Sequence, residues 1–437
     1  MDELKKYVDE VGALSSTPSF DIASARKAIL LTNEFFFATD SSLGTTRGID
    51  RDEAYFSEFH KYWESHYKEI IGASISIPQC TKVAEALHKV YQATSGKAFR
   101  QVNDMCGLSK QDFCRVRLLT ANQDFRGSRN NGDIIDVFNS NRGLFDLDAI
   151  IRNPAAFVSA INGSRLSQTD KRVEYAQRIA QFIKDCGTND PFQVIDYFGR
   201  DLLKFKEALI GYQGAGYGNK KADMLIRDFV VLGVWENCIN FDQINVASDV
   251  NTIKVALRTG ILQTEIPLVS SFLDQFCYQY GYIDSMSASA WRKVWEIWQE
   301  KYPEEKVESP SLLDFLIYDS VGRQLCKSGA LKELSCVKGH TFFASRKKKC
   351  PTCGAETVVV RSYLPCDIPQ GKDFVHSTAL YESGLFVPNI DECPFKAVCD
   401  EYSKKYLDAP KSISIYGQTG WTSSYAIKGK GGGGMMG

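Results

Sequence analysis

The chain has 437 residues, of which 44% are hydrophobic and 12% aromatic, and its formal net charge is −1. This is enough for a large core in two or three domains, and no apolar run approaches the roughly 20 residues of a membrane helix. The charged and polar N-terminus excludes an ordinary secretory signal, so we expect a cytoplasmic protein without membrane contact.

The near-neutral charge argues mildly against a nucleic-acid partner. A DNA groove nevertheless needs only a local basic stripe. Basic clusters occur beside Arg126, at Lys220 and Lys221, and in residues 345–350. Each cluster is explained equally well as an ordinary solvated face, so charge alone does not identify a partner.

Helical patterns dominate the chain up to about residue 330. Apolar residues recur at helical spacing, and Gly, Asn and Pro separate one segment from the next. Few segments alternate as strands do, although residues 357–365 predict one strand near the C-terminus. The predicted fold class is therefore mainly α. Helices are expected in residues 24–37, 79–99, 109–123, 132–141, 147–161, 170–186, 191–210, 248–262, 287–302 and 309–326.

A glycine-rich segment joins two of these helical patterns. From Gly211 onward, four glycines fall within eight residues and two lysines follow. A tight glycine hairpin between two helices lets backbone amides at the start of the second helix point outward, where they can bind an anion such as a DNA phosphate. A nucleotide-binding glycine loop would follow a strand, and a helical pattern stands there instead. The segment therefore predicts a hairpin between two helices.

This hairpin resembles that of the helix-hairpin-helix DNA glycosylases, the superfamily of endonuclease III and 8-oxoguanine glycosylase. The segment from Gly218 to Asp223 matches the family's Gly-x-Lys-x-Ala pattern. The resemblance implies that Lys220 is the nucleophilic lysine of members with lyase activity. It also implies that the hairpin contacts DNA through Gly214, Gly216, Gly218 and Lys221.

A second segment resembles the family's helix that opens on a catalytic aspartate. Residues 248–258 match it, which implies that Asp249 is catalytic and that Asn251 contacts DNA. The 29 residues from Lys220 to Asp249 are more than the family usually has, which implies an insertion around residues 231–247.

A third segment, residues 118–124, resembles the helix end that supplies an amide to fill the gap left by an extruded base. The resemblance implies that Asn122 or Gln123 has this role. The helix end with the amide, Lys220 and Asp249 then follow one another along the chain in the family's order. The resemblance covers roughly residues 105–330 and pieces of 390–402, and it does not explain the first hundred residues.

The residue types at these positions suit the removal of a base from deoxyribose, even apart from the family resemblance. Deoxyribose C1′ becomes electrophilic as a base departs, and a carboxylate such as Asp249 can stabilise that charge. A lysine amine such as Lys220 can attack the carbon and form a Schiff base. In the plainer interpretation, Lys220 and Lys221 contact phosphate and Asp249 only caps a helix. Asn122 and Gln123 would then be an ordinary polar helix end.

Cysteines cluster near the C-terminus, where seven of the thirteen lie between Cys326 and Cys399. In a reducing compartment such clustering favours metal ligation over disulfides. Four residues have the ligand types and spacing of a zinc ribbon with tetrahedral coordination. These are Cys336, His340, Cys350 and Cys353.

The resemblance implies a second metal site. Endonuclease III-type glycosylases hold a [4Fe–4S] cluster with four cysteines, the last two in a C-x5-C segment. Residues 315–326 match the helix with the first ligand, and residues 393–399 match the closing segment, but the ribbon separates them. The alternatives are a second zinc ion or a plain helical turn. The implied ligands are Cys326, Cys366, Cys393 and Cys399, while Cys80, Cys106, Cys114, Cys186, Cys238 and Cys277 are expected in the core.

Together these features predict a two-lobed, mainly α, helix-hairpin-helix glycosylase-like fold with a small Cys-rich C-terminal region. Its expected parts are an N-terminal helical region in residues 1–104, a glycosylase-like core in 105–330, a zinc ribbon-like insertion in 331–365, a region completing the iron–sulfur site in 366–426 and a disordered Gly-rich tail in 427–437.

The implied function is a monomeric DNA N-glycosylase that flips out and excises a modified base, with apurinic lyase activity through a lysine Schiff base. The additional N-terminal residues and the insertions favour an unusual base. An oxidised purine would indicate repair, and a hypermodified phage base would indicate antiviral defence. The alternatives are an N-glycosidase of a free modified nucleoside or nucleotide in salvage, and a non-catalytic DNA-binding protein.

Overall fold

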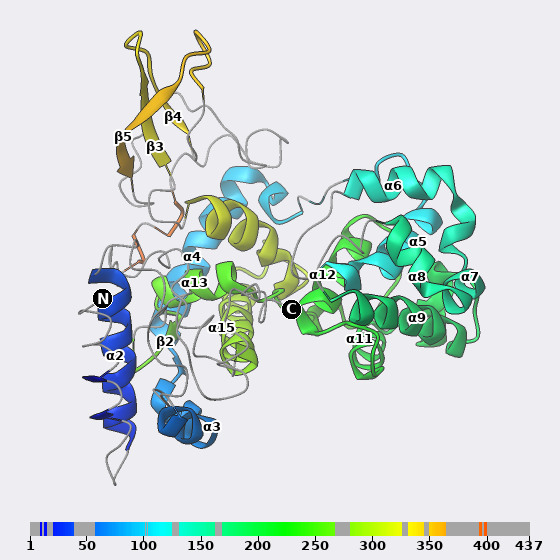
Figure 1. Ribbon diagram of the computed structural model, residues 1–437, viewed down its shortest axis with the longest axis horizontal. Helices are drawn as coiled ribbons and strands as arrows, with labels where there is room; N and C mark the ends of the chain where they lie inside the picture. The colour runs from blue at the N-terminus through cyan, green and yellow to red at the C-terminus, as the bar shows by residue number, and fades with distance from the viewer. Residues whose placement is uncertain are drawn as a thin grey trace. The chain divides into compact units, whose positions relative to one another are not determined.

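The computed structural model describes most of the chain between residues 21 and 363 and four short pieces outside it (Figure 1). The expected ligands Cys326 and Cys366 and the Gly-rich tail lie outside the described residues. The described residues are 9–10, 13–14, 21–38, 57–100, 102, 104–124, 131–161, 168–266, 280–325, 331–344, 349–363, 393–395 and 397–399.

The described part is mainly helical, as the sequence predicts. Among the described helices, none is both long and apolar enough to cross a membrane. The chain forms two compact units, each built from separate stretches. Unit 1 comprises residues 1–95, 248–301 and 316–435, and unit 2 comprises residues 96–247, 302–315 and 436–437.

Segments distant in sequence pair with one another within unit 1. Strand β1 (Ser74–Ile75) pairs antiparallel with β2 (Leu262–Gln263). Helix α4 (Ile77–Thr94) packs on α15 (Tyr280–Lys301), where Trp298 meets the rings of His88 and Tyr91 edge to face. Residues 74–94 of the predicted N-terminal region therefore pack with parts of the 248–301 stretch in unit 1. The other helices of unit 1 are α2 (Ile22–Ala38), α3 (Ser57–Ile71), α13 (Val250–Arg258) and the π-helix η9 (Phe315–Leu325), which begins in the last residue of unit 2.

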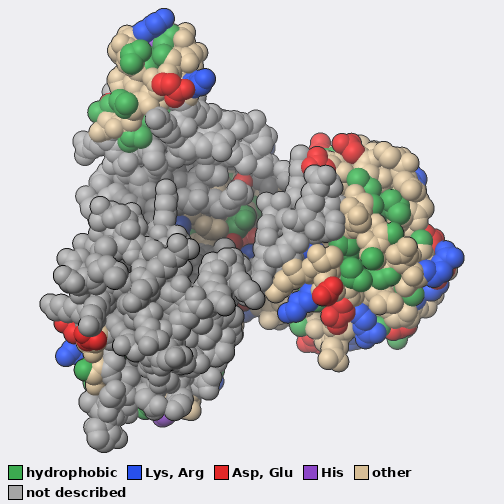
Figure 2. Space-filling model, viewed as in Figure 1, with side chains coloured by type: hydrophobic (Ala, Val, Ile, Leu, Met, Phe, Trp, Pro, Cys, Tyr) green, Lys and Arg blue, Asp and Glu red, His purple; other side chains and the backbone are tan. Residues whose placement is uncertain are grey.

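Unit 2 is a bundle of helices around an aromatic core. Phe205, Phe229 and Trp235 stack edge to face, with ring centroids 4.9 and 4.8 Å from that of Trp235. On the face shown in Figure 2, basic and acidic side chains are interspersed, as expected from the net charge. Its helices are α5 (Lys110–Thr120), α6 (Asn131–Ser140), α7 (Leu147–Arg152), α8 (Pro154–Ala160), α9 (Thr169–Asp185), α10 (Val194–Tyr197), α11 (Leu202–Gly211) and α12 (Asn219–Val231), with 3₁₀ turns η2 (Lys97–Phe99), η3 (Ala121–Gln123), η4 (Arg142–Phe145), η6 (Pro191–Gln193), η7 (Phe241–Gln243) and η8 (Pro310–Leu312).

One predicted helix, residues 147–161, is divided in two. Pro154 cannot donate a backbone hydrogen bond and disfavours helical geometry at Asn153, whose φ is −143°. The Asn153 side chain instead accepts from the amide of Ala156 at 3.1 Å and caps α8. The break between the two helices therefore results from Asn153 and Pro154, two neighbouring residues of the sequence.

The cysteine-rich region of unit 1 holds a three-stranded antiparallel sheet of order β4-β3-β5, from β3 (Leu331–Cys336), β4 (Thr341–Ala344) and β5 (Thr357–Tyr363). The predicted strand after the cysteine pair is confirmed as β5. Its partners β3 and β4 were not predicted, because neither has clear alternation. We call residues 331–363 the ribbon.

Helix α12 carries charged residues on its buried face. Lys206 of α11 lies 2.5 Å from the carboxylate of Asp223. Arg227 pairs with Asp314 and, at 2.7 Å, with Asp228. Burial alone would lower the pKa of Arg227, but the two neighbouring carboxylates outweigh it and raise that pKa. These pairs join α12 to α11 and to the 302–315 segment.

We predict that Arg227→Met destabilises unit 2 by about 3–5 kcal/mol, because it leaves the buried carboxylate of Asp314 without its cation. Guanidinium unfolding followed by circular dichroism measures the loss. Arg142→Met is the control, since its ion pair with Asp112 is exposed and should cost less than about 1 kcal/mol. Equal losses in the two variants would contradict the assignment.

Candidate functional site

The predicted hairpin is present between α11 and α12. Gly214 and Gly216 both have left-handed backbone conformations, with φ of 80° and 75°. A Cβ on Gly216 would lie 2.4 Å from the ring of Tyr175, and one on Gly214 would lie 2.7 Å from a carboxylate oxygen of Glu174. Glycine is required at both positions by backbone conformation and by the close approach of α9.

The hairpin is fixed to its surroundings by buried hydrogen bonds. The Asn122 side chain donates from Nδ2 to the carbonyls of Ala215, at 2.9 Å, and Tyr175, at 3.0 Å. The Tyr217 hydroxyl donates to the carbonyl of Leu118 at 2.6 Å, and burial raises its pKa. Arg178 of α9 donates to the carbonyl of Gln213 at 3.0 Å. The hairpin is therefore held from both α5 and α9.

Asn122 and Gln123, which the resemblance assigns to the gap left by an extruded base, are both buried in this structure. Both side chains are 0% exposed. Gln123 donates from Nε2 to the carbonyl of Arg172 at 3.0 Å, and Arg172 donates back to the carbonyl of Gln123. The two amides hold the protein together instead of facing a ligand. The sequence pattern predicts that the two amides lie at a helix end, but it does not predict that other residues pack over them.

The two lysines of α12 differ in their surroundings. Gly218 and Asn219, at the start of the helix, are exposed, and Lys220 in the first turn is half-buried. Lys221 is buried, and its Nζ donates to the carbonyl of Asn122 at 3.1 Å. Lys221, predicted to contact phosphate, thus makes an internal hydrogen bond, whereas Lys220 is half-buried at the helix start.

Asp249 caps α13, as its position before a helical pattern implied. Its Oδ1 accepts from the amides of Asn251, at 2.8 Å, and Thr252, at 3.0 Å. The Thr252 hydroxyl accepts from the amide of Asp249 at 2.7 Å, which completes a capping box. The Asn251 side chain donates from Nδ2 to Oδ2 at 3.3 Å, an interaction that the sequence did not reveal. Lys220 belongs to unit 2 and Asp249 to unit 1.

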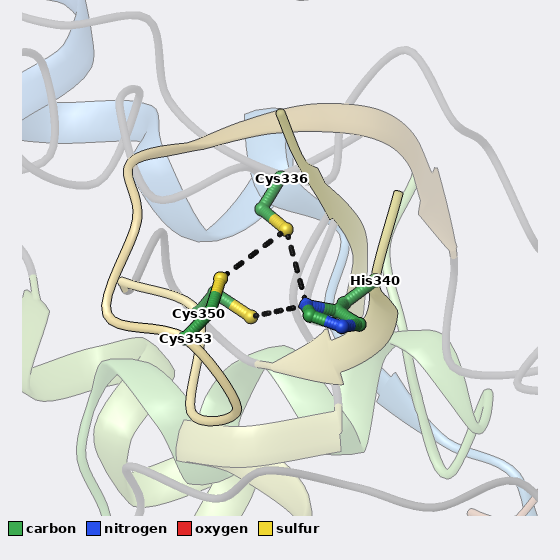
Figure 3. Close-up of side chains that lie close together, drawn as sticks. All are labelled: Cys336, His340, Cys350 and Cys353. Atoms are coloured by element: carbon green, nitrogen blue, oxygen red, sulfur yellow. Dashed lines mark hydrogen bonds between the residues drawn. The ribbon is translucent and has the colours of Figure 1, made fainter. Parts of the chain in front are cut away.

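The four predicted ribbon ligands are brought together, and their ligand atoms lie within 4.8 Å of one another (Figure 3). The Cys336 sulfur lies 3.5 Å from His340 Nδ1 and 3.7 Å from the Cys353 sulfur, and the Cys350 sulfur lies 3.6 Å from the same nitrogen. Metal–sulfur bonds of about 2.3 Å and metal–nitrogen bonds of about 2.0 Å give tetrahedral edges of about 3.8 and 3.5 Å. The group can therefore hold one metal ion.

Two glycine turns present these ligands. Gly339, with φ of 80°, closes the turn between Cys336 and His340. Gly354, with φ of 70°, directly follows the pair Cys350 and Cys353. The amide of Cys336 donates to the carbonyl of His340 at 3.1 Å, which aligns the ends of β3 and β4. The ligands thus come from the ends of strands and are fixed by backbone hydrogen bonds.

The electrostatics at Cys350 favour a thiolate. Burial acts to raise the pKa of Cys350, but the backbone N–H groups of Cys353 and Thr352 outweigh it and lower the pKa to about 6. A thiolate is the form that binds metal. Cys350 is thus better prepared for a cation than Cys353, where the backbone N–H of Ala355 acts to lower the pKa but burial and the neighbouring thiols of Cys350 and Cys336 outweigh it and raise that pKa.

The closing segment of the expected iron–sulfur site is only partly described. Cys393 is buried and Cys399 is half-buried. Between them, Phe395 is 0% exposed and its ring centroid lies 6.3 Å from that of Trp291 in α15. This anchors the segment in unit 1. The cluster itself remains a prediction.

We predict that Gly216→Ala destabilises unit 2 by about 2 kcal/mol or more, because alanine is strained at positive φ and its Cβ meets the Tyr175 ring. Denaturant unfolding provides the measurement. The control is Gly218→Ala, where the backbone is extended and an added Cβ meets nothing within 4 Å. If the two substitutions cost the same, the hairpin packing described above is wrong.

We predict one tightly bound metal ion per chain in the ribbon, lost in Cys353→Ser because three ligands cannot complete the tetrahedron. Elemental analysis of the purified protein measures the content. Hydrogen exchange should then accelerate in β3 and β5 while α9 and α12 keep their protection. The control is Cys186→Ser, a buried cysteine of unit 2 far from the group in sequence. Equal metal content in both variants would refute the site.

Comparison with known proteins gives no family assignment. No protein-family model matches the chain, and a search of curated proteins finds no similar sequence. The glycosylase resemblance therefore depends on the residues described above and their order along the chain.

Proposed function

We propose that the protein is a DNA N-glycosylase with apurinic lyase activity. The observation that carries this proposal is the hairpin, whose glycines place an open helix start at Gly218 and Asn219 with Lys220 in the first turn. A nucleophilic lysine at the start of a helix, beside a surface that suits a phosphate, is what a lyase acting on DNA needs.

The hairpin supplies the DNA contact in this proposal. The first amides of a helix have no partner within the helix and carry the positive end of its dipole. Gly218 leaves this end uncovered, since no side chain projects from it. A phosphate group of the DNA backbone is the natural ligand for such a site.

The chemistry follows from one lysine and one carboxylate. The neutral amine of Lys220 attacks C1′ as the bond from C1′ to the base breaks, and the base leaves with the bonding electrons and takes up a proton. The carboxylate of Asp249 stabilises the positive charge that develops on the sugar. Opening of the sugar ring, in which the C1′–O4′ bond breaks, O4′ takes up a proton and the amine loses one, yields a Schiff base; loss of a C2′ proton then eliminates the 3′ phosphate.

The ribbon is a second DNA contact in this proposal, with zinc as its metal. Residues 331–363 contain seven Lys or Arg and two Asp or Glu, a net charge of +5 against −1 for the whole chain. Lys338 and Lys349 are exposed there. A basic module of this kind suits a phosphate backbone. An iron–sulfur cluster, if bound by Cys393 and Cys399 with the two remaining ligands, would add about four irons per chain and would be structural.

The second candidate function is DNA binding without catalysis. One observation favours it: both carboxylate oxygens of Asp249 are already engaged, in a capping box and by the Asn251 side chain. Capping α13 is by itself a sufficient role for Asp249. In this case Lys220 contacts phosphate and no base is released.

We predict that borohydride traps a covalent adduct between the protein and an oligonucleotide with one abasic site. Lys220→Gln should abolish the adduct, lowering its yield more than about 100-fold, because no other amine replaces the nucleophile. Asp249→Asn should slow strand cleavage about tenfold or more. The matched control is Lys204→Gln, an exposed lysine of α11, which should trap normally.

Two outcomes separate the candidates. An adduct that persists in Lys220→Gln excludes Lys220 as the nucleophile. If the wild-type protein binds DNA but forms no adduct, the non-catalytic function holds. DNA affinity should fall with salt on a log–log slope of about −2 or steeper, since each phosphate contributes about −0.9. A slope near zero excludes both candidates.

A further inference from the structure

Gly322 lies at an unusually close approach between two elements of unit 1. A Cβ built there would lie 2.8 Å from the Cβ of Asn251 and 3.1 Å from its carbonyl oxygen. It would also lie 2.9 Å from the carbonyl oxygen of Ile317 in the same helix. These neighbours are a Cβ and two backbone atoms, which cannot rotate away as the end of a long side chain can.

The helix that carries Gly322 has π geometry along Phe315–Leu325. Such helices are rare, and where they occur they frequently lie at functional sites. Leu316, Ile317 and Val321 of this helix are buried, so its position in unit 1 is set by packing. The backbone of α13 therefore meets a fixed surface at Gly322.

The residue that Gly322 contacts also controls the carboxylate of Asp249. The backbone amide of Asn251 donates to Oδ1 at 2.8 Å, and its side-chain Nδ2 donates to Oδ2 at 3.3 Å. Asn251 thus donates hydrogen bonds to both carboxylate oxygens of Asp249. Any displacement of Asn251 changes the direction in which Asp249 presents its charge.

We propose that Gly322 is a positioning residue for Asp249, acting through Asn251. The absence of a side chain on η9 lets the first turn of α13 rest directly on the π-helix, and this contact sets the orientation of the carboxylate. The role of that carboxylate in catalysis rests on the proposed function. The contact between Gly322 and Asn251 is independent of that function.

The test is a double-mutant cycle of Gly322→Ala and Asp249→Asn. The control is Gly281→Ala, a helical glycine of α15 in the same unit, where an added Cβ meets nothing within 4 Å. The readout is the single-turnover rate of strand cleavage on abasic-site DNA, together with DNA affinity. A positioning role predicts at least about a tenfold slower rate for Gly322→Ala with unchanged affinity.

The cycle distinguishes positioning from general damage. In the Asp249→Asn background, Gly322→Ala should have little further effect, because the group through which it acts is gone. Full additivity of the two losses, or a rate equal to that of Gly281→Ala, would overturn the proposal.

A second measurement is independent of catalysis. Hydrogen exchange at the amides of Asn251 and Thr252 reports the cap directly, and Gly322→Ala should accelerate it at least about tenfold relative to Gly281→Ala. If wild-type protein neither cleaves nor traps abasic DNA, the proposed function fails, and exchange alone decides the positioning role. Unchanged exchange in Gly322→Ala refutes it.

Discussion

The hairpin depends on one buried amide. Asn122 donates to carbonyls in α9 and in the hairpin, and its own carbonyl accepts from Lys221 in α12. The side chain and the backbone carbonyl of Asn122 therefore join three elements. Glycine at 214 and 216 makes the arrangement possible, because any side chain there would separate the hairpin from α9. The position of Lys220 follows from these contacts.

Buried charge gives α12 its second constraint. Asp223 and Arg227 face the interior and pair with Lys206 and Asp314. Such pairs contribute little net stability compared with apolar residues, but removal of one partner is costly. Helix α12 therefore has one face specified by ion pairs, while Gly218 and Asn219 at its start are exposed. The same helix both holds unit 2 together and presents the proposed nucleophile.

The ribbon depends on a different source of stability. Its buried cluster consists of Leu334, Phe342 and two cysteines of the candidate metal site, Cys336 and Cys350. A core this small does not hold a fold alone, and in small metal-binding domains the binding free energy of the ion serves as folding free energy. A metal ion held by this group would therefore also stabilise the fold that carries the basic residues of the proposed DNA contact.

The sequence by itself determined the elements whose signals are local. Helical periodicity, the glycine hairpin, the Asp249 cap and the Cys336–Cys353 ligand spacing can all be identified from neighbours along the chain. Tertiary structure decided the rest. Packing buried Asn122, Gln123 and Lys221, which the sequence placed against DNA, and it joined residues 1–95 to 248–301 in one unit. Burial and long-range pairing depend on residues far apart in the chain, and no local pattern encodes them.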